Sequence, residues 1–189
     1  MVNYEVFALR TVSLPYINYC YIVLDKSSRS ALLIDPSWEL DAILGKLNDI
    51  DADVKGIMLT HSHYDHVNLA LVLTEIFECD VFMSKAEIED YGFHCTNLVS
   101  VSDQEVIFIG ETRVTCLWTP GHTSGSMCFL LEDCIFTGDT LFIEGCGACN
   151  FRGGSARRCL RAFKRLNRWQ LWTCACIPDI PTGPSLGRP

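Results

Sequence analysis

The chain contains 189 residues, of which 49% are apolar and 20% charged, so it is long and apolar enough to fold as one domain rather than remain disordered. No apolar run approaches the roughly 18 residues that a membrane-spanning helix needs, and we therefore expect no membrane association. The first residues lack the basic and then apolar pattern of a secretory signal, and the eleven cysteines have no regular spacing. We therefore expect a cytoplasmic protein whose cysteines are reduced thiols.

Strand-like and helix-like patterns alternate along the chain. Short apolar and β-branched runs predict a hairpin of residues 18–24 and 31–34, and apolar residues at helical spacing then predict a helix over 40–50. The further predicted elements, in chain order, are a strand at 54–60, a helix at 66–77, a strand at 80–83, a short helix at 85–90, strands at 105–109 and 113–118, and a hairpin of 127–131 and 134–137. Hairpins mixed with strand–helix units favour an α/β fold with a mixed sheet.

Three histidines and an aspartate follow the predicted strand 54–60 within six residues. They are His61, His63, Asp65 and His66, and they lie at a strand-to-helix turn. Zn²⁺ favours imidazole nitrogen and also accepts carboxylate oxygen as a ligand. The first two histidines suit one ion, and the aspartate with the third histidine suits a second. Because three of the five histidines lie in this turn, we favour a metal site over a solvated polar turn.

Two further strand ends carry possible ligands. His122 lies in a Gly/Pro-containing turn after the strand 113–118, and Asp139 follows a glycine after the strand 134–137. On its own, each would be an ordinary turn residue. Together with the first cluster they place His and Asp side chains in three strand-end loops, so we favour a centre with two metal ions.

The combination of these motifs resembles the metallo-β-lactamase superfamily over residues 4–154. The resemblance implies an α/β fold, the four-layer αββα sandwich, and a centre with two zinc ions. It implies that the first zinc is bound by His61, His63, His122 and Asp139, and the second by Asp65, His66 and the shared Asp139. It also implies that catalysis depends on Asp65 and Asp139, with a metal-bound hydroxide as the nucleophile. Asp35, at the end of an early strand, matches an acidic position behind the ligands, although an ordinary turn aspartate fits it equally well.

Within the superfamily, the sequence is most similar to the zinc-dependent acyl hydrolases of polyketide biosynthesis. His66 argues against those β-lactamases that have Arg or Cys at this position. Glyoxalase II-like hydrolases, which cleave thioesters, are also similar, but a glyoxalase II has an added C-terminal glutathione-binding domain for which this chain is too short. The similarity to the polyketide enzymes lies in the runs 4–9, 15–18, 141–149 and 153–155.

The run 141–149 contains one departure and one motif. Ala148 occupies a position where relatives often have a basic residue, so a contact with an anion from this position is not expected. Cys146 and Cys149 form a Cys-x-x-Cys pair that could bind metal or undergo redox cycling. With no second pair nearby, we favour packed thiols.

The resemblance implies hydrolysis of acyl thioesters, of the acyl-carrier-protein or coenzyme A type, in polyketide biosynthesis. We therefore expect a small acyl thioester or an acyl-carrier protein as partner, and neither nucleic acid nor membrane. No Gly-x-Ser-x-Gly nucleophile elbow is present, which agrees with water activated by zinc. Two alternatives stay open: a mononuclear iron enzyme of the persulfide dioxygenase type, with two His and one Asp, and a catalytically impaired, truncated or frame-shifted product.

The chain from residue 155 on departs from the superfamily pattern. That pattern includes a further histidine on a final strand, whereas no histidine follows His122. Residues 152–189 carry eight basic side chains and one acidic side chain, while the preceding residues have a net charge of −15. Basic arms of this kind are commonly solvated or bind nucleic acid, but the Trp, Cys and Pro residues of this one show no periodicity.

We favour a one-base shift of the reading frame near Ser155 over an evolved basic arm. Codons for Asp-Leu-Arg-Val-Tyr-Pro-Gly-His-Ser-Tyr-Gly, an ending typical of the superfamily, give residues 173–183 of this chain when they are read one base later. We therefore expect a hydrolase domain over 1–154 and a poorly ordered tail over 155–189, with the last strand and helix of the fold lost or replaced.

Overall fold

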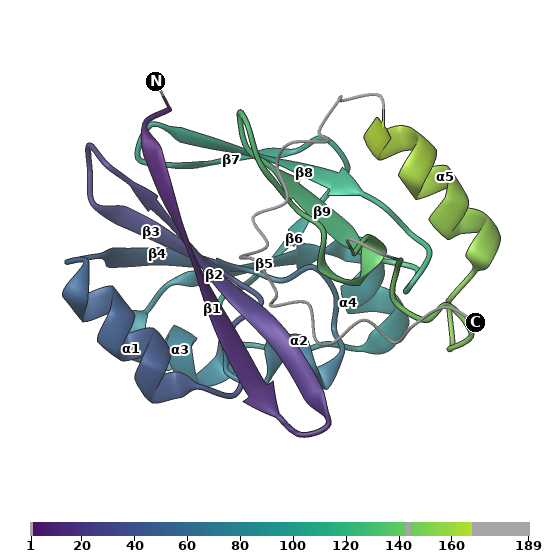
Figure 1. The fold of residues 1–189 in the computed structure, drawn as a ribbon, viewed down its shortest axis with the longest axis horizontal. Coiled ribbons are helices and arrows are strands. Elements are labelled where there is room, and N and C mark those ends of the chain that lie inside the picture. Colours follow the sequence, from purple (N-terminus) through teal and green to yellow (C-terminus); the bar gives the residue numbers. More distant parts are fainter. Residues whose placement is uncertain (1, 143–144, 168–189) are drawn as a thin grey trace, which may run out of the picture.

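Two β-sheets form the centre of the structure, a computed structural model that describes residues 2–142 and 145–167 (Figure 1). The first sheet has the strand order β1-β2-β3-β4-β5-β6, and the second has the order β10-β9-β8-β7. The strands are β1 (Tyr4–Ser13), β2 (Tyr16–Asp25), β3 (Ser30–Ile34), β4 (Asp53–Met58), β5 (Asp80–Ser84), β6 (Leu98–Val101), β7 (Val106–Ile109), β8 (Thr112–Trp118), β9 (Met127–Leu130) and β10 (Ile135–Phe136). The helices are α1 (Leu40–Asp49), α2 (Tyr64–Val67), α3 (Ala70–Phe77), α4 (Lys85–Tyr91), the 3₁₀ helix η1 (Gly138–Thr140) and α5 (Ala156–Leu166). Among these helices of the described residues, none has the length and apolar character needed to cross a membrane.

The sheets pack face to face, and helices cover both outer faces (Figure 1). Successive residues of β3 point to opposite sides, so Leu33 belongs to the core under the first helical layer and Leu32 to the core between the sheets. Ile43 of α1 and Leu73 of α3 complete the first core, whereas Leu166 of α5 packs on the far face of the second sheet. This αββα arrangement confirms the predicted fold class.

The strand directions bring several loops to one edge of the sandwich. β1, β2 and β3 form antiparallel pairs, while β3, β4 and β5 are parallel, so the chain leaves β3 and β4 at the same edge. Directly after β4, the carbonyl oxygen of Thr60 accepts a hydrogen bond from the backbone N–H of Met127, at the start of β9 (2.9 Å). This bond joins the two sheets at the edge where the predicted ligands lie.

The structure differs from the predicted elements at both edges of the first sheet and inside one helix. β1 and β6 were not predicted as strands, because they lie at sheet edges and most of their residues are only partly buried, which leaves no continuous apolar run. The helix predicted over 66–77 is divided into α2 and α3. At the break, Asn68 accepts a hydrogen bond from the backbone N–H of Trp38 (2.9 Å), a contact that no local pattern indicates.

Residues 156–166 form a helix, α5, so this part of the segment expected to be poorly ordered is ordered. The side chain of Ser155 caps α5 by accepting a hydrogen bond from the backbone N–H of Arg158. Cys159, Ala162 and Leu166, spaced three and four residues apart, form its buried face. The amphipathic pattern therefore packs this segment on the body. The frame shift near Ser155 stays a prediction, and the codon comparison at 173–183 concerns residues outside the described part.

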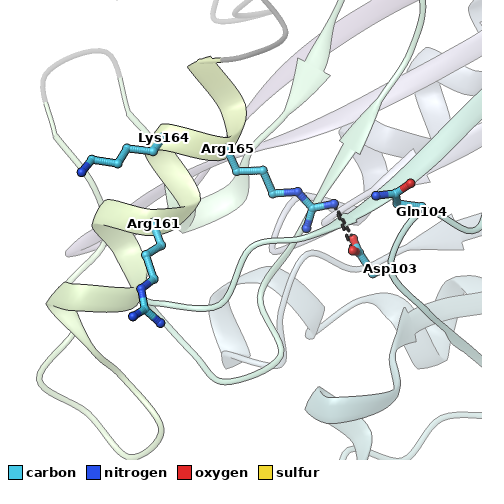
Figure 2. Close-up of a pocket in the computed structure, with 5 residues that line it drawn as sticks. All are labelled: Asp103, Gln104, Arg161, Lys164 and Arg165. Carbon is cyan, nitrogen blue, oxygen red and sulfur yellow. Dashed lines mark hydrogen bonds and ion pairs between the residues drawn. The ribbon is translucent and has the colours of Figure 1, made fainter.

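An ion pair adds a polar contact between α5 and the body. Arg165 donates hydrogen bonds to both carboxylate oxygens of Asp103 (2.8 and 3.0 Å) and to the carbonyl oxygen of Trp118 (2.7 Å). Figure 2 shows this pair beside Arg161 and Lys164, which come from the same helix. At least one basic residue of α5, Arg165, is thus bound to the acidic body. The domain boundary at residue 154 stays a prediction.

Candidate metal centre

Three loops at one edge of the sheets carry the predicted ligands. His61 and His63 lie in the loop after β4, and α2 follows directly with Asp65 and His66. The other two are His122, in the loop between β8 and β9, and Asp139, in η1. The contacts described below bring all of them to one place, whereas the fifth histidine, His94, lies exposed elsewhere.

His61, His63 and His122 form the first group of ligand atoms. Nδ1 of His63 lies 3.1 Å from Nε2 of His61 and 2.8 Å from Nε2 of His122, and the three atoms lie within 4.8 Å of one another. A single ring nitrogen either donates one hydrogen bond or accepts one, so the two contacts of Nδ1 cannot both be hydrogen bonds. Nitrogens bound to one tetrahedral zinc at about 2.0–2.1 Å are roughly 3.3 Å apart, which these rings fit.

His66 and Asp139 form a second group together with His61. Nε2 of His66 is buried and makes no hydrogen bond to any described residue. It lies 3.3 Å from Oδ1 of Asp139 and 3.8 Å from Oδ2 of Asp65, while Oδ2 of Asp139 lies 3.4 Å from Nε2 of His122. A buried, unpartnered imidazole nitrogen beside carboxylates fits a second cation, and Asp139 has one oxygen toward each group.

Asp65 lies at the margin of the centre, outside both closest groups of ligand atoms. The side-chain amide of Asn18, in β2, donates hydrogen bonds to the Asp65 carboxylate (3.0 Å) and to its carbonyl oxygen (2.6 Å). Asn18 therefore holds both the side chain and the backbone at the start of α2. Sequence reasoning did not identify Asn18 as functional, because it lies far along the chain from the histidine motif.

Asp35 lies behind the predicted ligands and contacts one of them, His66, and the adjacent Thr60. Its Oδ2 accepts hydrogen bonds from Nδ1 of His66 (2.9 Å) and from the hydroxyl of Thr60 (2.5 Å), and its Oδ1 accepts from the backbone N–H of Thr60 (2.7 Å). Because the Thr60 proton is directed to Asp35, its oxygen is free to accept from Nδ1 of His61 at 3.0 Å. These bonds place a proton on the outer Nδ1 of each ring and turn both Nε2 atoms toward the centre, where a metal can bind them.

The run 145–150 orients the remaining histidine. Nδ1 of His122 donates to the carbonyl oxygen of Ala148 (2.6 Å). A Cβ atom at Gly147 would lie 2.7 Å from that Nδ1 and 2.6 Å from Cβ of Asp139, so only glycine fits there. Cys146 and Cys149, on either side of this contact, are free and partly buried thiols.

Burial and neighbouring charges set the protonation of the centre. Burial, with the adjacent histidines, holds the pKa of His61 well below its usual value, and burial also lowers the pKa of His63. Burial would raise the pKa of Asp139, but His66 and the other histidines lower it. Burial would lower the pKa of His66, whereas Asp139 and Asp35 raise it to about 10. The neutral forms of His61 and His63 are thus favoured, and a cation at the second group would displace the proton of His66.

The structure is a sandwich of two sheets between helices, with histidine and aspartate side chains in three loops at one edge. This combination is typical of a metal-binding α/β enzyme. Residues 14–168 match the family model described as "Metallo-beta-lactamase superfamily". The chain belongs to this superfamily.

The relatives are consistent with this assignment. The chain is 50% identical over 164 residues to the "Probable polyketide biosynthesis zinc-dependent hydrolase PksB" of Bacillus subtilis, covering 87% of the chain and 73% of that protein. It is 32% identical over 138 residues to the cytoplasmic isozyme of hydroxyacylglutathione hydrolase from Saccharomyces cerevisiae, covering 69% of the chain and 50% of that protein. The solved structure of ETHE1 from Myxococcus xanthus has a TM-score of 0.75 and 30% identity, covering 85% of the chain and 69% of that structure. The predicted superfamily and the predicted class, a metal-dependent hydrolase, are confirmed, while the individual ligand roles stay predictions.

Proposed function

We propose that this chain is a zinc-dependent hydrolase that cleaves acyl thioesters in polyketide biosynthesis, with the acyl group carried by a small thiol or an acyl-carrier protein. The arrangement of His61, His63 and His122 around one point, with Asp139 shared by a second group, carries this proposal. The 50% identity to PksB supports zinc and the pathway. The similarity to hydroxyacylglutathione hydrolase, named for an acyl conjugate of a thiol, supports the thioester.

The donor set defines what each side chain would do. His61, His63, His122 and Asp139 would hold the first zinc, and Asp65, His66 and Asp139 the second; bound zinc supplies Lewis-acid activation of water and of the substrate carbonyl. The partly exposed carboxylate of Asp65 can accept the proton of the attacking water, because it faces the centre and remains open to solvent. Asp35 and Thr60 keep the imidazole rings in the orientation that binding requires.

One aromatic side chain beside the centre provides an apolar surface for an acyl group. The ring centroid of Phe151 lies 5.9 Å from that of His63 and 6.3 Å from that of His122, and more than half of this residue is exposed. An apolar wall next to a few polar groups is typical of small-molecule sites.

A second candidate is a mononuclear iron enzyme of the persulfide dioxygenase type. The structural similarity to ETHE1 from Myxococcus xanthus favours it. The buried, unpartnered Nε2 of His66 argues for a second cation instead. Metal content therefore separates the two candidates, since one iron per chain is expected for the oxygenase and zinc for the hydrolase.

The experiment loads the purified chain with Zn²⁺ or, without oxygen, with Fe²⁺, and measures thiol release from S-acyl N-acetylcysteamine and acyl-coenzyme A. We expect thiol release with zinc, its loss in His63→Ala, and its retention in the control His94→Ala, whose side chain is exposed. Oxygen consumption with a persulfide and iron, without thiol release in the zinc form, would favour the second candidate.

A catalytically impaired product is the third candidate, because the described residues give the second group no further histidine. The same assay on a protein with the proposed reading frame restored tests this. Activity that appears only after restoration identifies the 189-residue chain as the impaired form. Equal activity in both proteins would overturn the frame-shift interpretation.

A further inference from the structure

Glu87, in α4, is a fully buried acid that the chemistry described so far does not use (0% exposed). Its carboxylate lies between the loop that carries His61 and His63 and the loop that carries His122. We propose that Glu87 is a positioning residue that fixes His63 against His122 by holding these two loops together. The proposal rests on the metal centre proposed above and adds a determinant of its geometry.

Each oxygen of Glu87 binds one loop. Oε1 accepts hydrogen bonds from the backbone N–H and the hydroxyl of Ser62, both at 2.8 Å. Oε2 accepts from the hydroxyl of Thr123 (2.8 Å) and the backbone N–H of Gly125 (3.1 Å). Ser62 lies between His61 and His63 in the sequence, and Thr123 directly follows His122. One side chain therefore ties a loop of the first sheet to a loop of the second.

The donors around Glu87 require an acceptor at both oxygens. Hydroxyl groups can rotate to accept a hydrogen bond, but the backbone N–H groups of Ser62 and Gly125 cannot. A glutamine at this position would have to direct its NH₂ group at one of these N–H groups, whichever way its amide is turned. The substitution therefore detaches one loop with almost no change in volume, which makes it a selective test.

The surroundings hold the carboxylate in place. The hydroxyl of Ser84 accepts a hydrogen bond from the backbone N–H of Glu87 (3.1 Å) and donates to the carbonyl oxygen of Gly125 (2.5 Å). A Cβ atom at Gly125 would collide with the backbone nitrogen of Glu87, so the loop approaches α4 as closely as glycine allows. This close contact places the backbone of the loop directly against the glutamate.

His63 depends on this support more than the other ligands do. Nδ1 of His61 is hydrogen bonded to Thr60, and Nδ1 of His122 to Ala148. In the described part of the chain, the outer Nε2 of His63 has no such hydrogen-bond partner, and its ring packs against the rings of His61, His122 and Phe151. The orientation of His63 is therefore set mainly by its backbone, which Glu87 holds through Ser62.

The test compares Glu87→Gln with Glu89→Gln, a control on the exposed side of the same helix where Glu89 pairs with Lys85. Metal-depleted full-length proteins are titrated with Co²⁺, and the visible absorption of the bound ion reports the coordination of the first group. We expect Glu87→Gln to bind the first Co²⁺ at least about tenfold more weakly with an altered spectrum, and to lower kcat for thioester hydrolysis more than it changes KM. Glu89→Gln should match the parent in each measurement.

Two outcomes overturn the proposal in different ways. Parent-like Co²⁺ affinity and spectrum in a folded Glu87→Gln protein would show that Glu87 does not position the ligands. Failure of the parent to bind Co²⁺ would overturn the metal centre itself. If Glu87→Gln does not fold, Ser62→Ala and Thr123→Val serve instead, because each removes one hydroxyl donor to Glu87. Each should change the Co²⁺ affinity and spectrum in the same direction by a smaller amount. Unchanged spectra in both variants would contradict the proposal.

Discussion

The substitution Asp35→Asn isolates the control of His66 by the carboxylate behind it. Asp35 is buried and has a left-handed backbone (φ 48°), which asparagine also adopts, so the change adds no backbone strain. The atom at the Oδ1 position must remain an acceptor, because the backbone N–H of Thr60 donates to it. The NH₂ group therefore takes the Oδ2 position, which in the parent accepts from the Thr60 hydroxyl and from Nδ1 of His66.

This change alters the tautomer of His66. The Thr60 hydroxyl can rotate, but His66 regains a hydrogen bond only if its proton moves from Nδ1 to Nε2, the atom that lies 3.3 Å from Asp139. A protonated Nε2 cannot bind a metal. We therefore expect the affinity for the second metal to fall about 10- to 100-fold, and the free energy of unfolding to fall by about 1.5–3 kcal/mol for the lost bond to a charged group.

Calorimetric titration of the metal-depleted protein with Zn²⁺ measures the affinity, and urea unfolding measures the stability. Asp41→Asn, at an exposed position in α1, is the matched control and should leave both unchanged. A loss of stability with unchanged affinity for the second metal would refute the reasoning, because it would make Asp35 a purely structural residue.

Three further predictions concern the bridge, the last helix and a buried acid. Asp139→Ala should lower the content of both metals after dialysis, since Asp139 has an oxygen toward each group, whereas His66→Ala should lower only the content of the second metal. Equal metal contents in the two variants would argue against a bridge. Leu166→Ala should lower the free energy of unfolding in urea by about 2–5 kcal/mol, because the side chain is buried on the second sheet; no change would show that α5 does not pack. Burial would raise the pKa of Asp25, but hydrogen bonds from Ser27 and neighbouring groups hold it well below its usual range. Its contribution to stability is therefore present above about pH 4 and lost as the pH falls below this value. Asp25→Asn should thus lose less stability on acidification than the parent. Parallel curves of unfolding free energy against pH for the two proteins would count against this role.

The central strands and the histidine motif could be predicted because their signals are local. β3 is an apolar run after its first residue, β4 ends in buried apolar residues, and Asp35 and the histidine motif follow shortly after their ends. The edge strands β1 and β6 are half-buried, and their pairing depends on partners elsewhere in the chain. Sequence composition also misled the interpretation of α5, since its basic residues mask a buried face of three well-spaced residues.

The supporting residues of the site could not be predicted for a similar reason. Glu87 lies 25 residues after Ser62, and Asn18 lies 47 residues before Asp65. Each is an ordinary polar residue within its own segment, and only the packing of the sheets brings it to the centre. Four of the six predicted ligands thus lie in one local motif, whereas the orientation of the side chains depends on long-range hydrogen bonds.

The zinc content of the purified 189-residue chain, after dialysis against a weak chelator, tests the central claim most directly. We predict about one tightly held zinc per chain, lost in His63→Ala and retained in His94→Ala. The second ion should be held more weakly, since apart from His61 of the first group the described residues offer it only Asp65, His66 and the shared Asp139. A chain without bound zinc, or a zinc content unchanged by His63→Ala, would contradict the account.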